Sequence, residues 1–376
     1  MRIGLDLHVL GGRRTGTETY LENLVVQFSG LGSPHAFWLF TMDRTRTRAG
    51  IVQHPDFHTV VLPRVPLPVQ RFLLLPWVAL RERLDILHVQ RVAPWRISTR
   101  GVRVVVTIHD IAQRVVPECF GWTERVLLEP CLRWSAHRAD HVIVDSAFTR
   151  DELCRHYGVP GGRISVVPLG VDHLVFQPQG AEVLEATRSW LEAQWGVRMP
   201  FVLAVATWEP RKNLGHLLRA FQSAARAGDL QLVLVGKPGP AEGALRRLAR
   251  ELEIEDRVVF VGYIPRSQLP GVYAAARAFA FPSLYEGFGL PPLEAMACGT
   301  AVLAARASCL PEILGDAAVL LDPRSVEDWA GALRRVVQDE TWRRSLISRG
   351  LSHVRRYLWS ESARRTIEIY EEVAGS

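Results

Sequence analysis

Short apolar runs alternate with amphipathic stretches along this chain, and the alternation limits the fold more than any other feature. The first apolar run, residues 2–8, is followed by a glycine-rich turn at 11–16 and an amphipathic stretch at 17–28. A strand, a glycine turn and a helix in that order begin a Rossmann-like unit. Strands that alternate with helices predict a parallel sheet. In the first half we expect further strands at 36–41, 58–62, 86–89, 102–108, 142–144 and 164–167, and helices at 69–83 and 123–136.

The same order of elements starts a second time after residue 200. The pattern loosens beyond 168–172 into a stretch of Gln, Pro and Gly at 177–180. Strands are then expected at 201–206, 231–235, 258–260, 278–281, 300–304 and 318–321, and helices at 213–226, 242–252, 268–275 and 293–298. A chain of 376 residues is too long for one ordinary core. The sequence therefore predicts an α/β protein with two Rossmann-like, doubly wound domains, residues 1–172 and 173–354, facing each other across a ligand-binding cleft.

Charge and cysteine content exclude several classes of protein. The five cysteines are scattered without a C-x-x-C pair, which argues against a disulfide framework or a structural zinc site. Asp6 interrupts the apolar run that a signal peptide needs, so we expect a cytoplasmic protein.

Residues 1–172 hold 21 Lys and Arg against 16 Asp and Glu, whereas the remainder holds 24 against 23. A basic first half suits an anionic partner such as a membrane surface or a diphosphate. The arginines lack interleaved aromatic residues, so no nucleic-acid partner is expected.

One segment of the second half, residues 282–299, combines a glycine loop with two glutamates. It reads PSLYEGFGLPPLEAMACG and directly follows a predicted strand. Backbone N–H groups of Phe288, Gly289 and Leu290 can hold a phosphate where the next helix begins. Glu286 in the loop and Glu294 in the first turn of that helix would then bind hydroxyl groups, as on sugars. In the alternative interpretation Glu294 only favours the helix dipole and Glu286 is solvated. The ligand-binding interpretation is preferred, because α/β sheets bind ligands at the carboxyl ends of their strands.

This segment resembles the E-x7-E signature of the retaining group 1 glycosyltransferases, family 4 of the carbohydrate-enzyme classification, which have the GT-B fold. The resemblance implies that Glu286 contacts the transferred sugar and that Glu294 contacts the ribose of the nucleotide. Gly287 and the residues 288–290 are assigned with them to donor binding. Gly236, which closes the strand at 231–235, is assigned there as well.

The segment Glu209-Pro-Arg-Lys-Asn213 resembles the Arg-Lys-Asn loop of the same family, at the end of the second domain's first strand. The resemblance implies that Arg211 and Lys212 hold the donor diphosphate. A planar guanidinium and a point charge suit a leaving group that gains negative charge. In the alternative interpretation these two residues are solvated at the start of a helix. That interpretation is disfavoured, because positive side chains oppose the helix dipole at a helix N-terminus. We expect both cations to lie opposite the two glutamates.

His109 follows the strand at 102–108 and precedes Asp110, like the His-Asp pair that lines the cleft near donor sugar and acceptor in the family. A single histidine is more often structural than functional, and the chain has twelve. A ligand would nevertheless bind at the carboxyl end of a strand, which is where His109 lies. His109 is therefore our candidate for a catalytic histidine. Asp110 is expected to orient it.

The turn at 11–16 resembles the family's glycine loop that closes over the diphosphate, with Gly12 and Gly16 as the donor-contacting residues. It differs from many relatives by Arg13 and Arg14. These two arginines either hold an acceptor phosphate or are solvated, and the sequence favours neither interpretation.

Three other segments concern architecture and surface. Ser146 is expected to cap the helix that follows it. Residues 357–361 resemble the family's crossover, in which the last helix packs back on the first domain, so residues 355–376 are assigned to that domain. The apolar and basic stretch at 63–77 suits a peripheral contact with a membrane, or a helix that covers the sheet, and the second interpretation is preferred.

The resemblance implies transfer of a hexose, with retention of configuration, from a nucleoside-diphosphate sugar to a hydroxyl of a glycan or lipid-linked acceptor in cell-surface polysaccharide synthesis. GDP-mannose is the preferred donor and a UDP-sugar the alternative. No D-x-D motif occurs, so we expect no metal and no other cofactor.

The rival function is a sugar-nucleotide 2-epimerase of the same architecture, and a non-catalytic sugar-binding relative is a further alternative. A NAD-dependent dehydrogenase is disfavoured, because no G-x-G-x-x-G follows either first strand.

Overall fold

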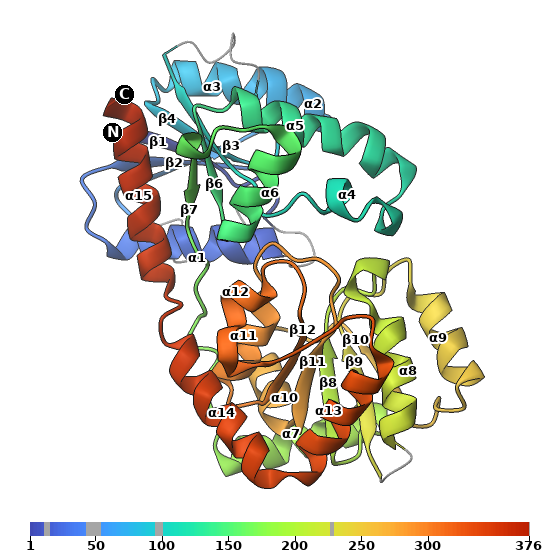
Figure 1. The fold of residues 1–376 in the computed structure, drawn as a ribbon. Helices are drawn as coiled ribbons and strands as arrows, with labels where there is room; N and C mark the ends of the chain where they lie inside the picture. The colour runs from blue at the N-terminus through green and yellow to red at the C-terminus, as the bar shows by residue number, and fades with distance from the viewer. Residues whose placement is uncertain (11–15, 43–53, 95–100, 226–228, 376) are drawn as a thin grey trace. The chain divides into compact units, whose positions relative to one another are not determined.

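The structure is a computed structural model that describes residues 1–10, 16–42, 54–94, 101–225 and 229–375. The chain divides into two compact units (Figure 1). Unit 1 comprises Met1–Gly170 and Tyr357–Ser376, and unit 2 comprises Val171–Arg356. The chain thus leaves unit 1 after residue 170, where 172 was predicted, and returns to it at 357, where 355 was predicted.

Unit 1 is built on a parallel sheet, with seven strands among the described residues in the order β3-β2-β1-β4-β5-β6-β7. Runs of β-branched residues such as Val104, Val105 and Val106 form the buried central strands. The strands are β1 (Arg2–Asp6), β2 (Ala36–Thr41), β3 (Phe57–Val61), β4 (Ile86–Gln90), β5 (Arg103–Thr107), β6 (His141–Val144) and β7 (Ile164–Val166).

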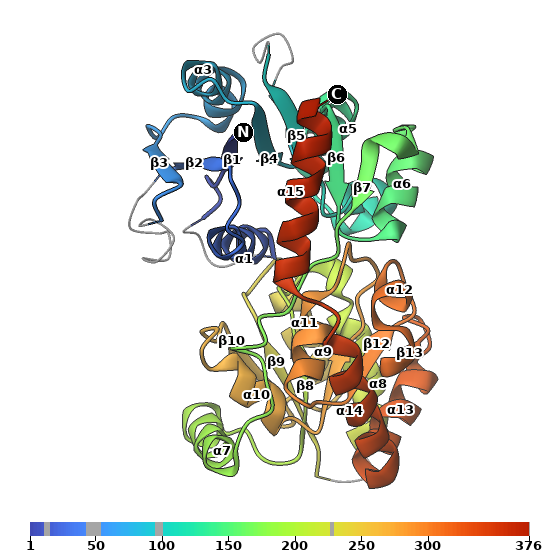
Figure 2. The same ribbon diagram turned by 90° about the vertical axis from the view of Figure 1, so that its left-hand side faces the viewer.

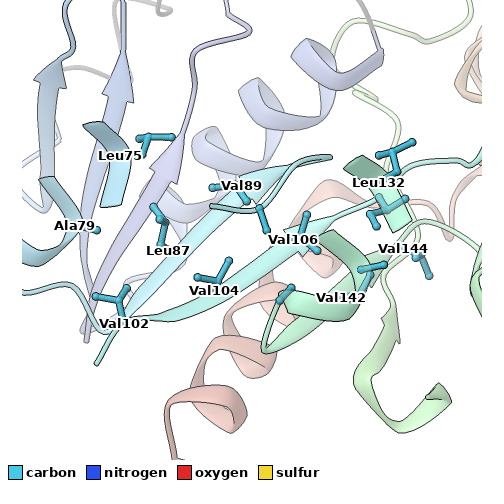
Figure 3. Packing of buried hydrophobic residues seen from close by; sticks show 14 of the residues in the cluster. Leu75, Ala79, Leu87, Val89, Val102, Val104, Val106, Leu132, Val142 and Val144 are labelled. Atoms are coloured by element: carbon cyan, nitrogen blue, oxygen red, sulfur yellow. The ribbon is translucent and has the colours of Figure 1, made fainter. Parts of the chain in front are cut away.

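The helical segments of unit 1 cover both faces of this sheet. On one face, Leu75, Ala79 and Leu132 pack on the valines of β4, β5 and β6 (Figure 3). On the other, α15 packs against α1 and β5 (Figure 2). The helical segments are α1 (Gly16–Gly30), α2 (Leu67–Val69), η2 (Gln70–Leu74), α3 (Leu75–Arg81), α4 (Ala112–Val115), η4 (Pro117–Cys119), η5 (Glu124–Leu128), α5 (Glu129–Arg138), α6 (Ala147–Tyr157), η6 (Gly161–Arg163) and α15 (Trp359–Gly375).

The two helices predicted at 69–83 and 123–136 each contain one π-helical turn, η2 and η5. Each turn immediately precedes a helical segment that carries a proline in its first positions, Pro76 in α3 and Pro130 in α5. A proline ring would clash with the carbonyl group four residues earlier in a regular α-helix. The wider π turn relieves that clash, so the helix continues through the proline.

Close packing joins the two points where the chain leaves and re-enters unit 1. A Cβ atom on Gly170 would lie 2.1 Å from the backbone nitrogen of Trp359, so only glycine fits there. Ser362 donates a hydrogen bond from its hydroxyl to the carbonyl oxygen of Pro168 at 2.6 Å. Helix α15 is therefore anchored in unit 1 by side-chain and backbone contacts. The predicted capping role of Ser146 is also confirmed, because its Oγ accepts from the Thr149 N–H at the start of α6.

A buried polar chain links α15 to the centre of the unit 1 sheet. The Nδ1 atom of His88 lies 2.6 Å from the Tyr370 hydroxyl, and its Nε2 atom lies 2.7 Å from the Thr107 hydroxyl. Thr107 in turn lies 3.2 Å from the hydroxyl of Tyr20 on α1. Each polar group is thus satisfied without water, which makes the chain compatible with its burial.

Acidification is expected to destabilise unit 1 through His88. Burial, with the neighbouring His109, lowers the pKa of His88 to about 3, against about 6.5 in an unfolded chain. As the pH falls from about 6.5 towards 3, only the unfolded chain binds this proton, so the free energy of unfolding falls by up to about 1.4 kcal/mol per pH unit. Urea unfolding at pH 7 and pH 5 measures the loss. A His88→Gln variant should lose less stability between these pH values, and an equal loss in both proteins would contradict the assignment.

Unit 2 is also built on a parallel sheet, and its described residues form six strands in the order β10-β9-β8-β11-β12-β13. The strands are β8 (Phe201–Val205), β9 (Gln231–Val235), β10 (Val258–Gly262), β11 (Ala278–Phe281), β12 (Val302–Ala305) and β13 (Val319–Leu321). The helical segments are α7 (Ala181–Trp195), η7 (Pro210–Lys212), α8 (Leu214–Ala225), α9 (Glu242–Glu251), α10 (Leu269–Ala275), α11 (Leu290–Ala297), α12 (Leu310–Leu314), η8 (Gly315–Ala317), α13 (Val326–Gln338) and α14 (Glu340–Val354). Helix α7 was not predicted from the sequence.

Candidate active site

Two loops of unit 2 are tied together at the carboxyl ends of the neighbouring strands β8 and β11. The turn η7 follows β8 and ends at Asn213, which has a left-handed φ of 55°. The Asn213 amide donates to the carbonyl oxygens of Pro282 at 3.2 Å and Pro323 at 2.9 Å. The Leu284 N–H donates to the carbonyl oxygen of Arg211 at 3.0 Å. In this strand order β8 and β11 meet at the switch point of the sheet, where α/β folds bind ligands.

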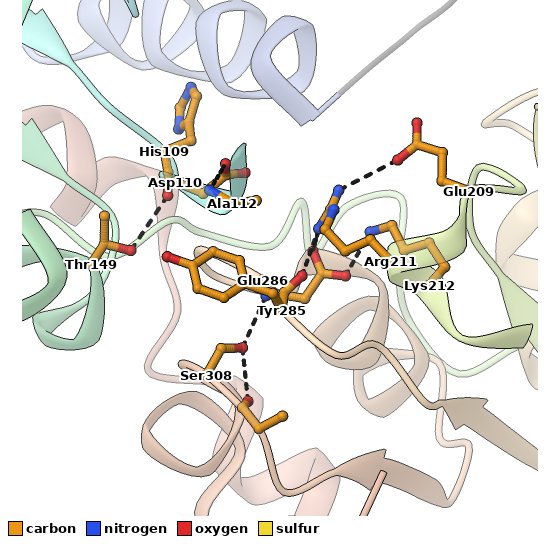
Figure 4. Close-up of polar contacts among 11 residues, drawn as sticks. His109, Asp110, Ala112, Thr149, Glu209, Arg211, Lys212, Tyr285, Glu286 and Ser308 are labelled. Carbon is orange, nitrogen blue, oxygen red and sulfur yellow. Dashed lines mark hydrogen bonds and ion pairs between the residues drawn. The ribbon is translucent and has the colours of Figure 1, made fainter. Parts of the chain in front are cut away.

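Glu286, Arg211 and Lys212 form one ionic cluster at this point (Figure 4). The Lys212 ammonium donates to Glu286 Oε1 at 2.6 Å, and the Arg211 guanidinium donates to Glu286 Oε2 at 3.1 Å. Arg211 also donates to the backbone oxygen of Tyr285 at 2.6 Å. The three charged side chains are only 10–14% exposed. Both cations thus lie opposite Glu286 and contact it directly.

A second carboxylate, Glu209, belongs to the charge balance of the cluster, because it lies 3.7 Å from Arg211 (Figure 4). Burial alone would raise the pKa of Glu286, but Lys212 and Arg211 outweigh it and lower that pKa to about 2. Burial lowers the pKa of Lys212, and Glu286 opposes this shift. Two cations and two carboxylates leave the cluster close to neutral, but Glu209 is 37% exposed, so its charge is screened by solvent more strongly than that of Glu286. Such a site can bind a phosphate group, whose oxygens would share the N–H donors that Glu286 now occupies.

The loop from Gly287 to Leu290 is buried except for Leu290, and it leads into α11. Gly289 caps the helix with a left-handed φ of 96°, and a Cβ atom there would lie 2.8 Å from a Leu310 methyl group. Pro291 and Pro292 carry no N–H group. Backbone donors at this helix start therefore come from residues such as Phe288, Gly289 and Leu290.

Glu294 lies in the second turn of α11, because that helix begins at Leu290 and not at 293 as predicted. The first-turn position expected for Glu294 is therefore wrong. Its Oε2 atom accepts a hydrogen bond from the Tyr273 hydroxyl of α10 at 3.1 Å. The side chain is partly exposed, so a polar ligand can reach it from solvent.

Ser308 supports the cluster from the loop after β12, and sequence reasoning missed it. Its hydroxyl oxygen accepts the N–H of Glu286 at 2.9 Å and donates to the carbonyl oxygen of Ala307 at 2.8 Å (Figure 4). Its φ of 51° lies in the left-handed region, which costs a serine energy. Ser308 belongs to no motif used above, so only the fold reveals this contact.

His109 lies in unit 1, two residues beyond the end of β5, and its partner is Asp145 and not Asp110. The His109 Nδ1 atom lies 2.7 Å from Asp145 Oδ2. Asp110 instead accepts the Ala112 N–H at 3.1 Å, and Thr149 donates to the carbonyl oxygen of His109 at 3.4 Å (Figure 4). The expected orienting role of Asp110 is therefore wrong.

The His109–Asp145 pair leaves one ring nitrogen for a ligand. Burial raises the pKa of Asp145, and His109 opposes this shift. A carboxylate accepts hydrogen bonds, so the proton of a neutral His109 belongs on Nδ1. Its Nε2 atom is buried and has no hydrogen-bond partner among the residues that the structure describes. The pair can therefore present Nε2 as an acceptor for a hydroxyl group.

The remaining residues predicted to bind the sugar-nucleotide donor lie in different parts of the chain. Gly12, with Arg13 and Arg14, lies outside the described residues. Gly16 is the exposed first residue of α1. Gly236 follows β9 with a φ of 144°, and a Cβ atom there would lie 1.9 Å from the carbonyl oxygen of Ala206. This close backbone contact accounts for the glycine by packing alone.

Two features are absent from the described residues. No helix among them is long and apolar enough to cross a membrane. No group of three or more His, Cys, Asp and Glu side chains in the described part of the chain is arranged to hold a metal ion.

Comparisons with known proteins agree with this architecture. Residues 193–353 match the family described as glycosyl transferases group 1, and residues 14–175 match glycosyltransferase family 4. O-antigen chain mannosyltransferase B of Escherichia coli is 32% identical over 317 residues, covering 82% of this chain and 81% of that protein. MMP α-(1→4)-mannosyltransferase of Mycolicibacterium hassiacum is 29% identical over 294 residues, covering 74% and 67%. The structure of Anabaena HepE with UDP-glucose has a TM-score of 0.77 over 99% of this chain and 100% of that chain, at 20% identity, which bears on the fold alone. The chain therefore belongs to the group 1 glycosyltransferases: it is a glycosyltransferase enzyme with the two Rossmann-like domains of the GT-B fold.

Proposed function

We propose that this enzyme is a retaining mannosyltransferase that uses GDP-mannose. The acceptor is a hydroxyl group of a glycan or lipid-linked saccharide in cell-surface polysaccharide assembly. The similarity to O-antigen chain mannosyltransferase B supports the sugar and the setting. The main support for this reaction is the cluster of Glu286, Arg211 and Lys212 at the switch point of unit 2. The cluster places a carboxylate that can bind a hydroxyl group beside two cations that can bind phosphate.

Each residue of the cluster has a proposed role in bond cleavage. The bond between the anomeric carbon and the donor phosphate breaks, and the nucleoside diphosphate leaves with the electron pair. Arg211, Lys212 and the N–H groups of residues 288–290 stabilise the charge of this leaving group. Glu286 holds a hydroxyl group of the transferred sugar, and Glu294 holds the ribose.

The acceptor oxygen attacks from the face that the diphosphate leaves, and its proton passes to a departing phosphate oxygen. His109 Nε2 accepts a hydrogen bond from a sugar hydroxyl in this proposal. Arg211 and Lys212 offset the diphosphate charge, so we propose that no metal ion is needed. The reaction is placed in the cytoplasm, where the protein associates peripherally with the inner face of the plasma membrane.

Product analysis tests the reaction class. Incubation with GDP-mannose and a mannosylated acceptor in EDTA should give a new α-glycosidic bond and release GDP, as NMR of the product would show. A free epimer formed without acceptor would assign the chain to the 2-epimerases. A β-linked product would overturn retention, and activity that requires added manganese would overturn metal independence.

The nucleotide base is tested by thermal shift in the same metal-free buffer. A nucleotide that binds only the folded enzyme stabilises it by about 2.7 kcal/mol at 100 times its Kd, which raises Tm by several degrees. GDP is expected to raise Tm more than UDP, ADP or dTDP at equal concentration. A larger shift with UDP would reassign the donor to a UDP-sugar and leave the mannose preference without support.

A further inference from the structure

A single hydrogen bond holds the ring of His109 among the described residues. Its Nδ1 atom lies 2.7 Å from Asp145 Oδ2, whereas Thr149 contacts the backbone oxygen of His109 and not the ring. That bond fixes the tautomer. It does not fix the plane of the ring, because the torsion between Cβ and the flat ring of a histidine has broad minima. A histidine that presents Nε2 to a substrate therefore needs a second contact that limits its tilt.

The ring of Tyr20 on α1 makes this second contact. Tyr20 is fully buried, at 0% exposure. The centre of its ring lies 5.0 Å from the centre of the His109 ring, and the two planes meet at 79°. Aromatic rings favour this edge-to-face arrangement, because the electropositive edge of one ring meets the electron-rich face of the other. A tilt of His109 would lose the contact, so Tyr20 restrains the ring plane that Asp145 leaves free.

Tyr20 is itself held on two sides. Its hydroxyl lies 3.2 Å from the hydroxyl of Thr107 at the end of β5, the strand that leads to His109. Its ring centre lies 6.4 Å from that of Trp359, the first residue of α15. Thr107 and Trp359 are buried as well. Tyr20 thus has a fixed position relative to the strand end that carries His109.

Tyr20 is unsuited to proton transfer. Burial raises the pKa of its hydroxyl; the contact with Thr107 opposes this shift, and the nearby Asp145 adds to it. The hydroxyl therefore stays protonated at neutral pH. An effect of Tyr20 on the proposed reaction would pass through its ring contact with His109.

We infer that Tyr20 is a positioning residue of the transfer reaction, which holds the plane of the His109 ring so that Nε2 faces the substrate hydroxyl. The inference rests on the role proposed for His109 and adds a separate function to it. Asp145 sets which nitrogen carries the proton, and Tyr20 sets where the ring points. Such placement matters, because a shift of about 1 Å in a reacting group can cost about a hundredfold in rate.

Replacing Tyr20 by leucine tests the inference. The variant should lower kcat at least about tenfold, with little change of KM for GDP-mannose, because the ring of His109 is less well placed. In the unliganded protein, ¹³C relaxation of the C–H groups of the His109 ring should show more motion than in the native enzyme. The ¹⁵N shifts of the ring should stay native, since Asp145 still sets the tautomer. Tyr20→Phe keeps the aromatic ring and should retain both the native ring motion and most of the rate.

Phe28→Leu is the matched control for Tyr20→Leu. Phe28 lies eight residues further along α1, is 2% exposed and stacks on Phe37 at 4.9 Å between ring centres. Its substitution removes a buried aromatic ring from the same helix at a comparable cost in stability. The rate and the motion of the His109 ring should remain native. Thermal melting checks that each variant is folded at the assay temperature, and Tyr20→Met replaces Tyr20→Leu if that variant is not.

Four results would overturn the inference. Unchanged motion of the His109 ring in folded Tyr20→Leu would do so whatever the reaction, because this measurement needs neither donor nor acceptor. Greater ring motion with a native kcat would overturn it together with the role proposed for His109, so the two failures are distinguishable. An equal loss of kcat in Phe28→Leu would reduce the effect to a general loosening of α1. An equal loss in Tyr20→Phe would assign the effect to the hydroxyl and not to the ring.

Discussion

Replacing Lys212 by alanine is expected to lower kcat at least about a hundredfold. Its ammonium would be one of the two cations at the departing diphosphate, and removing one preorganised donor to developing charge costs about 10²–10³ in rate. The substitution also leaves Glu286 buried with Arg211 as its remaining cationic contact at 3.1 Å. The cluster loses one of its two positive charges, so GDP should bind more weakly as well. Steady-state kinetics with GDP-mannose and calorimetric titration with GDP measure the two effects.

A matched control for Lys212→Ala is Arg344→Ala, which removes a cation from the same unit. The Arg344 side chain is 77% exposed on α14 and pairs with Glu340, so its loss should change neither rate nor nucleotide affinity. Thermal melting must show that Lys212→Ala remains folded at the assay temperature. A folded Lys212→Ala enzyme with near-native kcat would remove Lys212 from the mechanism.

Most strands of both sheets could be predicted from the sequence, because buried parallel strands are short and rich in β-branched residues. The strands at 36–41, 231–235 and 278–281 match their predicted bounds. Helix α7 was missed, since it follows a stretch of Gln, Pro and Gly and only Leu191 in it is buried. With so narrow a buried face, the helix lacks the apolar periodicity that identifies amphipathic helices.

The start of α11 was placed three residues too late for a different reason. The predicted bounds of 293–298 left Pro291 and Pro292 outside the helix, although proline is well tolerated in the first turn of a helix. The error moved Glu294 from the second turn to the first. Element boundaries of this kind depend on one or two backbone angles, here the left-handed φ of Gly289, which no pattern of apolar residues reveals.

The charged residues of the site could be named from their motifs, but their contacts could not. Glu286 and Lys212 are 74 residues apart in the chain, and their ion pair follows from the adjacency of β8 and β11. Asp145 left a signal, because it directly follows a predicted strand, as His109 does. Asp110 was chosen instead, by its adjacency to His109 in the sequence. The carboxyl ends of neighbouring parallel strands, here β5 and β6, proved the better guide to which side chains meet.

Replacing Asp145 by asparagine is expected to lower kcat about a hundredfold, with a smaller effect on KM for GDP-mannose. An asparagine amide can donate to His109 Nδ1, which would move the ring proton to Nε2 and turn the proposed acceptor into a donor. A misplaced proton on a group that assists the reaction costs about 10²–10⁴ in rate. The ¹⁵N shifts of the His109 ring in labelled protein report the tautomer directly, so a purely structural defect would not produce the same change.

Asp110→Asn is the control that separates the two candidate partners of His109. Asparagine retains the side-chain oxygen that accepts the Ala112 N–H, so the loop after β5 should keep its conformation and the enzyme its rate. If Asp110 oriented the histidine, the order of the two variants would be reversed. A native tautomer and a native kcat in Asp145→Asn would show that the 2.7 Å contact has no role in presenting Nε2 to a substrate.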